Sequence, residues 1–63
     1  MAVFQLNQEE LRNIQLLIEQ QDRMLGKLAL YVENTKTQKI QQYFEKEIAY
    51  VEMVKSQLMN YLN

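Results

Sequence analysis

The chain has 63 residues, with seven lysines and arginines against eight aspartates and glutamates, and with neither cysteine nor histidine. A chain of this length makes one small domain, and oligomerisation is a common way for so small a core to gain stability. The absence of cysteine and histidine excludes disulfides and the usual zinc sites, and a net charge of −1 lacks the basic footprint of a nucleic-acid binder.

The sequence gives no sign of a membrane protein or of a secreted one. No apolar run approaches the roughly 20 residues that span a bilayer, and no helix carries the cationic face of a membrane-surface helix. The first residues lack the basic region and the apolar core of a signal peptide. We therefore expect no membrane partner, and a cytoplasmic location by default.

A first helix is expected over about residues 8–33. Asn7 can serve as its N-cap, and Glu10 stands three residues later, where it can complete a capping box. Phe4 and Leu6 precede this cap and could pack on the end of a helical bundle. The absence of proline and the presence of a single glycine favour a long, uninterrupted helix.

One side of this helix is apolar over its whole length. Steps of 100° per residue gather on it Leu11, Ile14, Leu17, Ile18, Met24, Leu25, Leu28, Ala29, Tyr31 and Val32. The stripe is wider than the ~100° of an ordinary surface helix. Gln21 interrupts it near the middle.

A turn at about residues 34–36 should separate this helix from a second one over about residues 36–62. Asn34 tolerates a left-handed conformation after a helix end, and Thr35 with Gln38 can form a second capping box. A loop this short places the two helices side by side and antiparallel. The expected fold is an all-α, antiparallel two-helix hairpin that forms a single domain over residues 1–63.

The second helix carries a similarly wide apolar stripe, made of Ile40, Tyr43, Phe44, Ile48, Tyr50, Val51, Val54, Leu58, Met59, Tyr61 and Leu62. Its polar residues, Gln41 among them, are expected on the solvated side. Glu47 falls near the middle of the stripe.

Both stripes are wider than a hairpin alone can bury, because the contact between two helices takes about two residues in seven. The surplus consists of Leu17, Met24, Tyr31, Tyr43, Tyr50 and Tyr61, and with Val54 we expect these side chains at an interface. Two hairpins related by a two-fold axis would form a four-helix bundle. A homodimer is the first expectation and a tetramer the second, while a different protein could also complete the bundle.

Gln21 and Glu47 are predicted to meet inside the bundle. If the turn is centred between Asn34 and Thr35, residues whose numbers add up to about 69 lie at the same level. The pair would then form a polar layer that fixes the register, as a buried Asn does in coiled coils. The alternative is a carboxylate metal site, although bundles that hold two iron ions also use histidine, which this chain lacks.

Residues 21–62 resemble the small ferritin-like hairpins of the spore coat protein F family of endospore-forming bacteria. The resemblance lies in Gln21-Asp22-Arg23-Met24-Leu25, in Asn34 of the turn, and in Ile40-Gln41-Gln42-Tyr43-Phe44. It implies a helical hairpin in a bacterial structural protein and, with it, a location in the spore. The chain differs in having Thr35 where the family often has proline.

The leading functional hypothesis is a small structural or assembly protein that self-associates through the apolar faces of its hairpin. The alternative is a regulatory module that presents this apolar face to another protein. An enzyme is not expected, because Ser56 is the single serine and a triad would need histidine. No cofactor is expected either.

Overall fold

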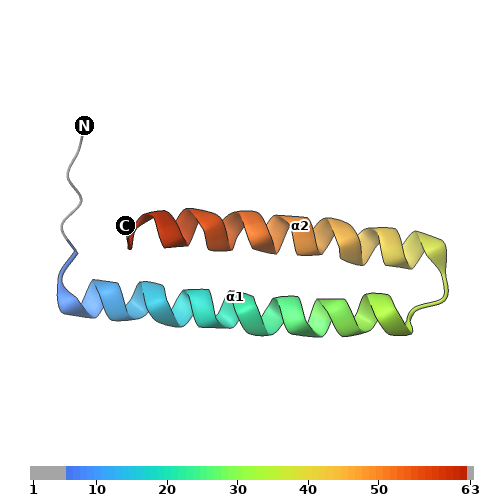
Figure 1. The fold of residues 1–63 in the computed structure, drawn as a ribbon, viewed down its shortest axis with the longest axis horizontal. Coiled ribbons are helices and arrows are strands. Elements are labelled where there is room, and N and C mark those ends of the chain that lie inside the picture. The colour runs from blue at the N-terminus through green and yellow to red at the C-terminus, as the bar shows by residue number, and fades with distance from the viewer. Residues whose placement is uncertain (1–5, 63) are drawn as a thin grey trace.

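The structure, a computed structural model, describes residues 6–62 and consists of two long α-helices. Helix α1 spans Gln8–Asn34 and helix α2 spans Gln38–Asn60, with a short turn at residues 35–37 between them. The helices lie side by side and antiparallel, with the turn at one end of the molecule (Figure 1). The predicted all-α hairpin is confirmed, while Phe4, which we expected to pack on the bundle end, lies outside the described residues.

The start of α1 is fixed by two hydrogen bonds between residues three positions apart. The Asn7 side chain accepts a hydrogen bond from the Glu10 N–H at 2.7 Å, and the Asn7 N–H donates to the Glu10 carboxylate at 3.2 Å. Two backbone donors that a helix start leaves without partners are thereby satisfied. The predicted capping box is confirmed.

The turn differs from the prediction in two respects. Helix α1 continues through Asn34, whose side chain donates to the Leu30 carbonyl at 2.9 Å, and no described residue has a left-handed backbone. The residue that ends the helix is Thr35, in an extended conformation. The second capping box is wrong, because the N-cap of α2 is Thr37, and its side chain makes no capping hydrogen bond.

Gln41 of α2 closes the end of α1. Its side-chain amide donates to the Val32 carbonyl at 3.5 Å and, by a shorter bond, to the Thr35 carbonyl. The last carbonyls of a helix lack partners within the helix, so a side chain from the next helix can supply the missing donors. The expectation that Gln41 lies on the solvated side is therefore wrong: it is half-buried against the turn.

The two helices meet along one narrow row of side chains, which we call the seam. Its members follow one another at intervals of three and four residues, and all are buried or half-buried: Ile14, Ile18, Gln21, Leu25, Leu28 and Val32 of α1, and Gln41, Phe44, Ile48, Val51, Lys55 and Leu58 of α2. This spacing is that of helices packed side by side. Among the described residues only Leu28 and Val51, each 7% exposed, are buried.

Three contacts give the register of the hairpin. The residue numbers of the contacting pairs add up to 73 for Val32 and Gln41, 75 for Tyr31 and Phe44, and 77 for Asp22 and Lys55. Side chains that meet across the seam thus have numbers that add up to about 75. The expected value of about 69 is wrong. The turn is centred on residue 36 rather than between residues 34 and 35, which moves the sum to 72 and accounts for about half of the difference.

Candidate interaction surface

One broad side of the hairpin is formed by the residues that stand immediately before a seam residue. A 100° step carries each of them to the same side of its own helix. Because the helices are antiparallel, the preceding residues of both helices lie on the same side of the hairpin. We call this side the open face; its apolar members are Leu17, Met24 and Tyr31 of α1 and Ile40, Tyr43, Tyr50 and Val54 of α2. Tyr61, seven residues after Val54 and one residue past the end of α2, continues the row.

The apolar side chains of the open face are largely exposed. The exposed fraction is 42% for Leu17, 49% for Met24 and 49% for Tyr31. On α2 it reaches 60% for Tyr43 and 59% for Tyr50, whereas Val54 is half-buried. The hairpin therefore leaves uncovered the surplus that the wide stripes predict, and Ile40, which we expected in the buried stripe, is also 45% exposed.

Aromatic rings join the two helices on this side. The Tyr31 ring of α1 lies 5.4 Å from the Phe44 ring of α2, tilted by 42°, and the Tyr43 ring packs edge-on against Phe44 at 5.8 Å. Both distances fall in the range of favourable aromatic pairs. Since Tyr31 and Tyr43 flank one seam ring, they hold the open face together near the turn.

Gln21 and Glu47 do not meet. Gln21 is a half-buried seam residue, whereas Glu47 is half-buried and stands on the open face, one position before Ile48. Their numbers add up to 68, about seven short of the register sum, so about two helical turns, or roughly 10 Å, separate their levels. No hydrogen bond joins them among the described residues. The predicted polar layer of these two residues is therefore not present within one hairpin.

The opposite side of the hairpin is polar and acidic. The residues that stand immediately after a seam residue include Glu19, Asp22, Glu33, Glu45 and Glu52, and none of the others within the two helices is a lysine or arginine. Lys55, from the seam, extends toward α1 and forms an ion pair with Asp22 at 2.5 Å. The pair is half-exposed and contributes at most about 1 kcal/mol.

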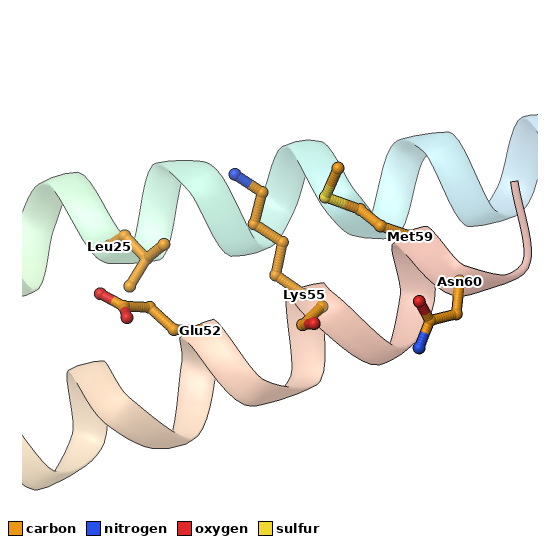
Figure 2. A pocket seen from close by; sticks show the side chains of 6 residues that line it. Leu25, Glu52, Lys55, Met59 and Asn60 are labelled. Carbon is orange, nitrogen blue, oxygen red and sulfur yellow. The ribbon is translucent and has the colours of Figure 1, made fainter. Parts of the chain in front are cut away.

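Figure 2 shows a shallow hollow beside this ion pair, with the Lys55 side chain extending from α2 toward α1. The hollow is lined by Leu25, Glu52, Lys55, Ser56, Met59 and Asn60. Sequence reasoning missed Lys55, although its spacing, four residues after Val51 and three before Leu58, places it in the seam. Because the lysine is already paired with Asp22, the hollow offers no free cation to a ligand.

The described residues contain no group of three carboxylates that could hold a metal ion. Neither α1 nor α2 is apolar enough over a sufficient length to cross a membrane. Comparison of the chain with models of protein families, with curated protein sequences and with solved structures gives no match. The open face is therefore the main feature of this hairpin from which a function can be argued.

Proposed function

We propose that the chain is a small assembly protein, and that two hairpins associate through their open faces into a four-helix bundle. The observation that carries this proposal is a contrast: among the described residues only Leu28 and Val51 are buried, whereas the leucine, methionine and tyrosine side chains of the open face stay about half-exposed. Apolar surface of this extent marks an interaction site in soluble proteins. In this role the chain performs no catalytic step.

The dimensions of the hairpin suit a two-fold pairing. A standard interface buries about 800 Å² on each partner. The hairpin is 46 Å long, and two helices side by side are about 20 Å wide. Tyrosine and methionine are enriched in the cores of such interfaces, because they supply large contact areas and adapt to a neighbouring surface. The acidic side of each hairpin would remain outward, where like charges oppose further stacking.

The first test is the mass of the chain in solution, measured by light scattering over a concentration series. We expect a dimer at high concentration that dissociates on dilution. A tetramer would support self-assembly with a different stoichiometry. A chain that stays monomeric at every concentration would contradict the proposal.

Two methionines provide a matched pair of variants. Met24 lies on the open face and Met53 on the side of α2 that points away from α1, and both are 49% exposed. We expect Met24→Glu to weaken the dimer by at least about tenfold, since a carboxylate would have to be desolvated in the interface. Met53→Glu should leave the dimer unchanged, and equal effects of the two substitutions would place the interface elsewhere.

A second candidate function is a regulatory module that binds another protein. Leu16 and Leu30, 44% and 56% exposed, lie on the outer side of α1, which pairing of the open faces would leave uncovered. This observation favours an additional partner there. The resemblance to the spore coat protein F family, and with it a bacterial origin and a place in the spore, stays a prediction, as does a cytoplasmic location.

A further inference from the structure

Two charged residues of opposite sign interrupt the open face. Lys27 stands between Met24 and Tyr31 on α1, and Glu47 stands between Tyr43 and Tyr50 on α2. Within the described rows from Leu17 to Tyr31 and from Ile40 to Tyr61, no other open-face residue is charged. A charge in the middle of an apolar interface is costly unless a partner neutralises it.

Lys27 and Glu47 lie at the same level of the hairpin. Their numbers add up to 74, close to the sum of 75 that describes side chains meeting across the seam. They form no ion pair within one hairpin, where the described residues contain only that of Asp22 and Lys55. Each charge is therefore available to a second copy of the chain.

Two arrangements of two hairpins place the open faces together. If the two-fold axis runs parallel to the helices, both turns lie at the same end and α1 of one copy lies over α2 of the other. Such an axis does not shift levels along the bundle, so Lys27 of each copy faces Glu47 of the other. If the axis is perpendicular to the helices, α1 lies over α1 and α2 over α2, so Lys27 faces α1 and Glu47 faces α2 of the other copy, and neither charge meets one of opposite sign.

From this complementarity, and on the basis of the function proposed above, we propose that the occupant of the open face is a second copy of this chain, with both turns at the same end and two intermolecular Lys27–Glu47 ion pairs. The same register would place Met24 against Tyr50 and Tyr31 against Tyr43 of the other copy. The ion pairs select this arrangement over the one with turns at opposite ends, because the alternative leaves each charge in the interface without a partner of opposite sign.

The orientation can be measured in the full chain with one substitution. The chain contains no cysteine, so Lys36→Cys in the exposed turn provides a unique site for a spin label. With turns at the same end, we expect two labels in the dimer to lie within about two helix diameters, roughly 20 Å. With turns at opposite ends, their separation would approach the 46 Å length of the hairpin.

Charge reversal tests the ion pairs independently of the label. We expect Lys27→Glu and Glu47→Lys, each alone, to weaken the dimer by about tenfold, since each replaces two attractive contacts with two repulsive ones. An equimolar mixture of the two variants should regain the wild-type dissociation constant, which also shows that both variants fold. Glu45→Lys and Lys46→Glu, away from the open face, are the matched controls.

The outcomes separate this inference from the proposed function. A wild-type chain that stays monomeric overturns both. A dimer with distant turn labels would support self-association but contradict the arrangement with both turns at the same end. A mixture of the two variants that binds more tightly than the wild-type chain would do the same. Single reversals that behave like their controls show that the ion pairs do not form.

Discussion

At the residue scale, the end of α1 depends on a side chain that belongs to α2. The Gln41 amide donates to carbonyls of Val32 and Thr35 and is half-buried against the turn. We expect Gln41→Ala to lower the free energy of unfolding by about 1 kcal/mol, because the carbonyls lose their donor in a partly dry site. For a domain of this size, that loss lowers the melting temperature by about 4–8 °C.

Gln42→Ala is the control for this prediction, since Gln42 is the same residue type one position later and is exposed. Alanine favours helix formation slightly more than glutamine does, so this variant should melt at or just above the wild-type temperature. Thermal unfolding followed by circular dichroism distinguishes the two. Equal melting temperatures would mean that Gln41 adds nothing to the closure of α1.

The two ends of α1 differ in how well the sequence predicts their caps. The capping box of Asn7 and Glu10 joins groups three residues apart, and sequence reasoning found it. At the other end, Asn34 was expected just after the helix and Thr35 in the cap of the second helix. Asn34 is instead the last residue of α1 and Thr35 is its C-cap. Several polar residues of the turn could serve as caps, so the sequence alone does not select among them. The choice among them depends on Gln41, which contacts Val32 from nine residues away once the helices have packed.

At the scale of the helices, the seam contains a polar residue whose hydrogen-bonding groups gain nothing from the hairpin. Gln21 is half-buried, and its side chain makes no hydrogen bond to another described residue. We expect Gln21→Leu to raise the free energy of unfolding by about 1 kcal/mol, because an apolar side chain would complete the seam between Ile18 and Leu25. Urea denaturation measures the change.

Gln15→Leu, on the exposed polar side of the same helix, should change the free energy of unfolding by less than about 0.5 kcal/mol. A loss of stability in Gln21→Leu would contradict our expectation and would support a register-setting role for Gln21 in the assembled bundle. The sequence could place Gln21 in the stripe, since 100° steps depend on the helix alone. It could not supply the register, because a late turn shifted every partner across the seam and separated Gln21 from Glu47.

At the scale of the whole molecule, a hairpin in which Leu28 and Val51 are the buried ones among the described residues has little core of its own. Hydrophobic burial has to offset the entropy lost by ordering the chain, and a small domain does so only marginally. The open face holds much of the large apolar surface that remains. Covering it with a second copy would therefore supply a core that a single hairpin lacks, and folding would be coupled to association.

This coupling makes the melting temperature depend on protein concentration. For a dimer that unfolds into two separate chains, a tenfold increase in concentration stabilises the folded state by about 1.4 kcal/mol, which raises the melting temperature by about 5 °C for two chains of this length. Calorimetry over a hundredfold concentration range measures the shift. The Met53→Glu variant should show the same dependence, whereas Met24→Glu should melt at a lower temperature at every concentration. A melting temperature that stays constant in the wild-type chain would mean that one hairpin folds alone, and the open face would then have no part in its stability.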